Sequence, residues 1–99
     1  MDVIRIKDFV VRPSTYEDGQ VIFQLISPSI QKGLEVEVSF AGVHAVPSAF
    51  VNAAFVQLLE HAPSGQVKAC LRISNSTKFI NELIKRRFDF VENNRPRQP

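Results

Sequence analysis

The chain has 99 residues, 44% of them hydrophobic and 22% charged, which suits one domain with its own core and does not suit a disordered protein. It contains neither an eighteen-residue apolar run nor the basic-then-apolar start of a secretory signal, so we expect no membrane segment. The single cysteine, Cys70, cannot form an internal disulfide and fits a reducing compartment. These features predict a cytoplasmic protein.

The formal net charge is only +2, far from the basic excess typical of nucleic-acid binders. The distribution is uneven, because six basic residues face seven acidic ones up to Thr77, whereas six face three from Lys78 onward. The basic character therefore belongs to the C-terminal end.

The first third of the chain predicts a strand or a bent hairpin, followed by one ambiguous segment. Residues 3–7 interleave β-branched and charged side chains, as strands do, and the apolar pattern continues through residues 9–11 until Pro13 interrupts it. In residues 19–33 the apolar positions fit either a strand or one face of a helix, with Pro28 against an uninterrupted helix. The residues alone leave both readings open there.

The middle of the chain predicts a strand followed by a helix. Residues 34–40 alternate strictly between apolar and polar, which is the clearest strand pattern in the sequence. After a turn at residues 41–43, Ser48 is placed to be the N-cap of a helix over residues 49–60. That helix is apolar nearly all round, so it should be deeply packed or contact a partner.

The last third predicts a strand and an amphipathic helix. Apolar residues alternate with Lys68, Cys70 and Arg72 over residues 67–73, and Thr77 lies in a polar loop that supplies a helix N-cap. Apolar residues then recur at helical spacing from Phe79 to Phe88. Residues 90–91 would add a short edge strand or dock, and residues 93–99 form a flexible basic, proline-containing tail behind a single domain over residues 1–92.

This order of elements predicts an α/β sandwich in which crossover helices join consecutive strands. We expect four or five strands.

Residues 36–51 form a strand, a Gly42-Val43 turn and a serine-containing helix start with Phe50, and this pattern resembles the centre of STAS-like domains, the relatives of bacterial anti-sigma-factor antagonists. Upstream, Arg12, the Asp18-Gly19 pair and the spacing of residues 25–33 resemble the STAS-like family of unknown function that often accompanies histidine-kinase-like ATPases. The likeness extends from Val3 to Val91. It implies a small STAS-like sandwich with a mixed sheet of four or five strands, about three helices, and a helix over residues 19–33 with Pro28 at a kink.

The resemblance also implies a role. STAS domains have no chemistry of their own; they bind a kinase or another regulator, and in the best-known members a serine at the start of the second helix is phosphorylated to release the partner. Ser48 matches that position. A phosphate there would meet free helix amides while placing close to two negative charges on a surface that the partner must cover.

The sequence departs from the family pattern at four positions, Ser39, Ala49, Ala53 and Val56, so a constitutive binding module remains the alternative to a phosphorylation switch. In either case the expected partner is a histidine-kinase-like ATPase or another regulator. The expected contact surface is the loop of residues 41–46 with the helix start at residues 47–52. Its named residues are Ser39, His44, Pro47, Ser48, Ala49 and Asn52.

Two further hypotheses come from other features of the sequence. A basic group could contact an acidic partner or, as an alternative function, nucleic acid: Lys85, Arg86, Arg87, Arg95 and Arg97. The apolar helix over residues 49–59 suggests a second copy of the chain, as in a homo-oligomeric inhibitory or structural protein.

Nothing in the sequence predicts an enzyme, a cofactor or a metal site. Neither His44 nor His61 has a second ligand three or four residues away, and Cys70 has no Cys or His two residues away. The four glycines are isolated in turns, so no phosphate-binding loop is present. We expect His44 to lie in an exposed loop and His61 to interact with a helix C-terminus.

Overall fold

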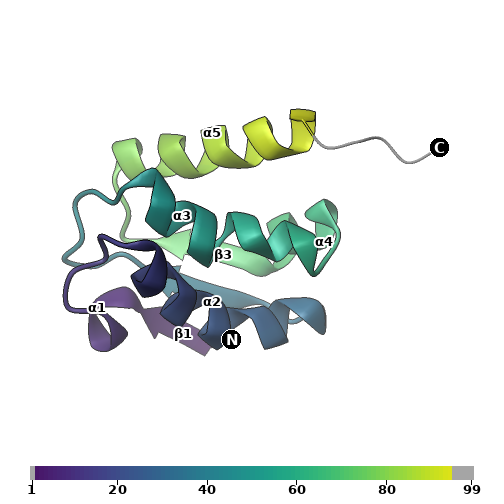
Figure 1. Ribbon diagram of the computed structural model, residues 1–99. Helices are drawn as coiled ribbons and strands as arrows, with labels where there is room; N and C mark the ends of the chain where they lie inside the picture. The colour runs from purple at the N-terminus through teal and green to yellow at the C-terminus, as the bar shows by residue number, and fades with distance from the viewer. Residues whose placement is uncertain (1, 95–99) are drawn as a thin grey trace.

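The computed structural model describes residues 2–94, and Figure 1 shows how the elements are arranged. In chain order they are β1 (Asp2–Arg5), α1 (Ile6–Phe9), α2 (Tyr16–Gln31), β2 (Val36–Ser39), α3 (Ser48–Ala54), the 3₁₀ helix η1 (Val56–Glu60), α4 (Ser64–Cys70), β3 (Leu71–Ser74) and α5 (Lys78–Asn94). The predicted α/β class is confirmed.

The sheet is smaller than predicted and has a single strand direction. In the described residues it has three strands in the order β1-β2-β3, and both pairings are parallel, with Ile4 beside Val38 and Val38 beside Ile73. The expectation of a mixed sheet of four or five strands is therefore wrong, as is that of about three helices. The difference arises because residues 6–9, 67–70 and 90–91, which have strand-like composition, are helical.

Alternate residues of the strands have different surroundings. Val36 and Val38 are buried in the core, whereas Val3 on the neighbouring strand is 53% exposed, and Arg72 is exposed and pairs with Glu35 at 2.8 Å. In Figure 1, α2 and α3 run across the front of the sheet, α4 lies at the end where β3 begins, and α5 runs beside α3. The core thus lies between the strands and the helices.

The ambiguous segment at residues 19–33 belongs to α2, as the resemblance implied. The helix begins with a capping box: Thr15 Oγ1 accepts a hydrogen bond from the Asp18 amide at 3.1 Å, and the Asp18 carboxylate accepts from the Thr15 amide at 3.1 Å. The hydrogen bond from the Ser14 amide, followed by the bonds from Thr15, holds the pKa of Asp18 below its ordinary value against the opposing effect of desolvation. Pro28 lies inside the helix on an exposed position, where water can hydrate the carbonyl that proline leaves unpaired.

Gly19 lets α2 approach α3 closely. A Cβ at this position would lie 2.5 Å from the Phe50 carbonyl oxygen and 2.7 Å from the Ala53 Cβ. Both distances are shorter than van der Waals contact, so only glycine permits this helix packing. The packing fixes the position of α3, on which Ser48 lies.

The apolar helix predicted over residues 49–60 is two elements. Helix α3 ends at Ala54, Phe55 departs from helical geometry with φ −121° and ψ −47°, and η1 follows. Phe50, Phe55 and Leu58 have no exposed surface, so their apolar character is satisfied inside one molecule. The observation that suggested a second copy of the chain therefore has an explanation within the fold.

The strand predicted over residues 67–73 is mostly wrong. Residues 64–70 form α4, and the strand β3 occupies only residues 71–74. Val67 and Cys70, three residues apart, are the buried residues of α4, which is a helical spacing that the period-two alternation concealed. Cys70 is consequently buried, with 5% exposure, and does not lie on the open face of a strand.

The amphipathic C-terminal helix is confirmed and longer than predicted. Thr77 Oγ1 accepts a hydrogen bond from the Ile80 amide at 3.1 Å, as expected of an N-cap. The helix includes residues 90–91, so the expected edge strand there is wrong. It also includes residues 93–94, which were predicted to belong to the flexible tail. Residues 95–99 of that tail lie outside the described part. The last turns of α5 contact α4, since Glu92 pairs with Lys68 at 2.8 Å and accepts from Ser64 at 2.8 Å. In the described part of the chain, no helix has the length and apolar character needed to cross a membrane.

Candidate functional site

Ser48 is the first residue of α3, one position later than predicted. The N-cap is Pro47, whose extended backbone lets its carbonyl accept hydrogen bonds from the Phe50 amide at 3.1 Å and the Val51 amide at 3.3 Å. Because Ser48 already has helical geometry, its hydroxyl does not cap the helix, and the prediction of a serine N-cap is wrong. The Ser48 side chain is exposed.

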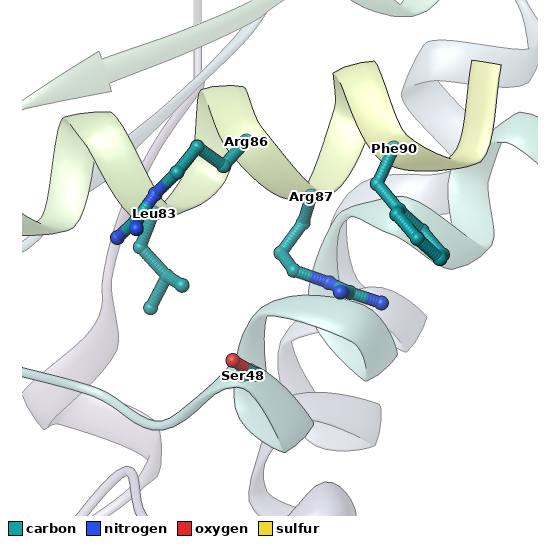
Figure 2. A pocket seen from close by; sticks show the side chains of 5 residues that line it. All are labelled: Ser48, Leu83, Arg86, Arg87 and Phe90. Atoms are coloured by element: carbon teal, nitrogen blue, oxygen red, sulfur yellow. The ribbon is translucent and has the colours of Figure 1, made fainter. Parts of the chain in front are cut away.

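The exposed side of Ser48 faces α5 across a groove of about 320 Å³. Figure 2 shows the groove, with Ser48 at the start of α3 and the other four side chains projecting from α5. The lining residues are Ser48, Leu83, Arg86, Arg87 and Phe90. The fold thus places the predicted serine beside two members of the predicted basic group.

Arg87 is held in a fixed position within this groove. Its Nε donates a hydrogen bond to Asn52 Oδ1 at 3.0 Å, and its guanidinium carbon lies 4.9 Å from the centroid of the Phe90 ring. The second contact is a cation–π interaction, which is stabilising at this distance. Asn52, predicted as a contact residue, therefore acts in this structure by positioning Arg87.

The remaining basic residues have other environments. Lys85 and Arg86 line a neighbouring depression together with Glu82 and Asp89, so carboxylates accompany the cations on that side of α5. Arg95 and Arg97 lie outside the described residues. Of the three members of the predicted group within residues 2–94, Arg86 and Arg87 line the groove with Ser48, and Lys85 does not.

Other residues of the predicted surface do not lie in the groove. His44, in the loop before α3, is exposed as predicted and lines a different depression with Lys7 and Arg12. Pro47 and Ala49 are exposed, but neither lines the groove. The structure therefore divides the predicted contact surface into two regions.

Ser39 is a buried structural residue. It is 3% exposed, and its Oγ accepts hydrogen bonds from Asn75 Nδ2 at 2.9 Å and from the Ala41 amide at 3.2 Å. These bonds join the carboxyl end of β2 to the loop after β3. A partner covering the surface would not reach this side chain.

His61 lines neither the groove nor the two depressions described above. It follows the last residue of η1, and its ring centroid lies 5.4 Å from that of Phe23 in a tilted arrangement. Among residues 2–94, no group of three or more His, Cys, Asp or Glu side chains could hold a metal ion. The arrangement around Ser48 suits binding through charge and apolar contact.

Sequence reasoning missed Leu83 and Phe90 as groove residues. Leu83 belongs to the apolar stripe predicted from Phe79 to Phe88 and is buried in the core at 8% exposure, whereas Phe90 was assigned to an edge strand or a docking segment. Their spacing with Arg86 and Arg87, at three or four residues along α5, places all of them on neighbouring positions of one helix. Continuing the helical pattern beyond Phe88 would have found this set.

A family model, described as the STAS-like domain of unknown function (DUF4325), matches residues 18–81. The chain belongs to this STAS-like family. The resemblance inferred from the sequence is thereby confirmed, and the three-stranded parallel sheet with its helices is consistent with a STAS-like fold. No curated protein and no solved structure matches the chain.

The family match covers only one side of the groove in this STAS-like domain. Ser48 and Asn52 lie within residues 18–81, whereas Arg86, Arg87 and Phe90 lie beyond them. One wall of the groove is therefore built from the matched region and the other from the following turns of α5.

Proposed function

We propose that this STAS-like domain is a non-catalytic regulatory module that binds a protein partner at the groove between α3 and α5. The observation that supports the proposal most directly is the presence of exposed Ser48 and two guanidinium groups in one groove. Phe90, which is 55% exposed, adds apolar surface to the same groove, whereas Leu83, at 8% exposure, belongs mainly to the core. A partner segment with acidic and apolar side chains is complementary to this combination.

Phosphorylation of Ser48 would regulate such binding through charge. A phosphoserine carries about 1.5 to 2 negative charges at neutral pH and forms strong hydrogen bonds with arginine. In this groove it would offset most of the two positive charges of Arg86 and Arg87. An acidic partner segment would then lose its attraction, so modification releases the partner.

The partner we propose is a histidine-kinase-like ATPase or another regulator, because the STAS-like family sets this expectation. The test is affinity purification of the tagged protein from a lysate of its native host after nuclease treatment, with quantitative mass spectrometry. We expect Arg86→Glu to remove a stoichiometric partner that wild type retains. The matched control is Lys32→Glu, which makes the same charge change at an exposed position after α2.

The outcomes separate the parts of the proposal. If the Arg86→Glu protein retains as much of the partner as the Lys32→Glu protein does, binding at this groove is refuted. Ser48→Ala serves as the uncharged control and should bind the partner as wild type does. If Ser48→Asp also binds with unchanged affinity, the switch is refuted and a constitutive module is left. Retention of nucleic acid without nuclease, lost steeply as salt rises, would favour the nucleic-acid alternative.

A further inference from the structure

A second depression, of about 230 Å³, lies at the carboxyl ends of β1 and β2. Its walls come from three segments: Lys7 in α1, residues 11–14 after α1, and residues 42–45 after β2. Figure 1 shows these loops together at the edge of the sheet toward which the strand arrows point. In open parallel sheets, ligands bind outside the carboxyl ends of the strands, because the loops that follow the strands converge there.

The lining of this depression is strongly biased toward positive charge. Lys7, Arg12 and His44 supply nitrogen donors from all three segments, and no carboxylate is among the lining residues. In the part of the chain that the structure describes, the ion pairs are Lys68–Glu92 and Arg72–Glu35, so Lys7 and Arg12 have no acidic partner. Two cations that line one depression repel one another, and an anion bound between them removes that repulsion.

The loop geometry holds Lys7 at the rim of the depression. Gly42 has a φ of +80°, a conformation that favours glycine, and a Cβ built there would lie 3.1 Å from Lys7 Cδ and 3.9 Å from its Nζ. The Lys7 stem therefore lies along the backbone of the loop that carries His44. Nearby, the Ser14 amide is already engaged by the Asp18 carboxylate at 3.1 Å, so this amide is not free to bind a ligand.

The size of the depression limits what it can enclose. Pockets that bury a drug-sized molecule measure roughly 300–1,000 Å³, so a site of this volume takes a charged head group. Three donor side chains match the three terminal oxygens of a phosphate monoester, with the planar guanidinium of Arg12 suited to a two-point contact. We propose that this depression binds phosphate, either as the free ion or as the monoester end of a small molecule, through Lys7, Arg12 and His44.

The experiment is a titration of the isotope-labelled full chain followed by backbone amide NMR. Inorganic phosphate and adenosine monophosphate are added separately, and potassium chloride at matched ionic strength reports non-specific screening. We expect saturable shifts confined to residues 7–14 and 42–45. Saturation by both ligands identifies the monoester end as sufficient, and saturation by inorganic phosphate alone identifies the free ion as the ligand.

Variants test which side chains bind the phosphate. Lys7→Gln and Arg12→Gln should each weaken binding of inorganic phosphate roughly tenfold, because each removes a charge-assisted hydrogen bond. Lys32→Gln, which removes an exposed lysine outside the depression, should leave the affinity unchanged. The proposal is overturned if phosphate gives no more than the chloride shifts, or if Lys7→Gln and Arg12→Gln bind it as wild type does.

Discussion

Replacing Gly19 with alanine should destabilise the protein, although alanine is the better helix former. Gly19 lies in α2 where this helix crosses α3, and an added Cβ would be 2.5 Å from the Phe50 carbonyl oxygen and 2.7 Å from the Ala53 Cβ. A third atom, the Ala54 amide nitrogen, would lie at 3.1 Å. Two of these three atoms belong to the backbone of α3, so no side-chain rotation can remove the clash.

The magnitude follows from two opposing effects. Overpacking a well-packed interface costs about 1–3 kcal/mol, and rigid backbone neighbours favour the upper part of that range. The gain from glycine to alanine inside a helix is at most about 1 kcal/mol. We therefore expect the free energy of unfolding to fall by about 1–2 kcal/mol. The expected loss in Tm is about 4–8 °C for each kcal/mol in a domain of this size.

Gly65 provides a matched control for this substitution. It also lies in a helix, α4, but a Cβ there would meet no atom within 4 Å. Gly65→Ala should stabilise the protein by about 0.4–1 kcal/mol through the lower entropy of the unfolded chain. Urea denaturation followed by circular dichroism measures both changes. The packing argument fails if Gly19→Ala is as stable as wild type, or if both variants shift in the same direction.

Three further predictions concern side-chain hydrogen bonds of the α2 capping box and of Ser39. Thr15→Ala removes the side-chain acceptor of the α2 capping box and should cost about 1 kcal/mol in urea denaturation. Because the pKa of Asp18 is lowered in the folded state, its contribution is complete at neutral pH and is lost as the pH falls through that lowered value. The stability difference between wild type and Asp18→Asn should therefore shrink below about pH 3.9, and a difference that grows there would contradict this sign. Ser39→Ala, which deprives Asn75 Nδ2 and the Ala41 amide of an acceptor, should cost about 1–2 kcal/mol, whereas a neutral effect would show that water replaces the hydroxyl.

The sequence predicted best where pattern and length agreed. The strict alternation around Val36 and Val38 was resolved as β2, and the long apolar stripe from Phe79 onward was resolved as α5. Helix α2 was different, because the residues at 19–33 fitted two structures and only the family resemblance favoured the helix. Its capping box at Thr15 and Asp18 was a local signal that would have settled the question.

The failures were in short segments. Residues 67–73 alternate in polarity, yet tertiary packing selected the helical pair Val67 and Cys70 for burial and left only residues 71–74 for the strand. Gln66 contributes to this choice, since its side-chain amide donates to the Ile30 carbonyl at 2.6 Å and ties α4 to the end of α2. Such a contact joins segments 36 residues apart, so a local pattern gives no sign of it.

The candidate site shows the same limit. The sequence singled out Ser48 from the family pattern and Arg86 and Arg87 from their charge, and treated them as parts of competing hypotheses. The packing of α5 beside α3 places all three in one groove. Proximity of this kind depends on how α3 and α5 pack in the tertiary fold, and residue type and local spacing do not predict that packing.

The separation of Ser48 from His44 has a consequence for regulation. The two residues are only four positions apart in the chain, yet Ser48 lines the groove with α5 and His44 lines the depression with Lys7 and Arg12. Pro47, the N-cap of α3, marks the change of direction between them. A phosphate on Ser48 would thus alter the charge of the partner groove directly, whereas ionic screening weakens its effect on the second depression, which it does not line. The two surfaces of this STAS-like domain are therefore expected to respond independently, so that Ser48→Asp changes partner binding without displacing phosphate.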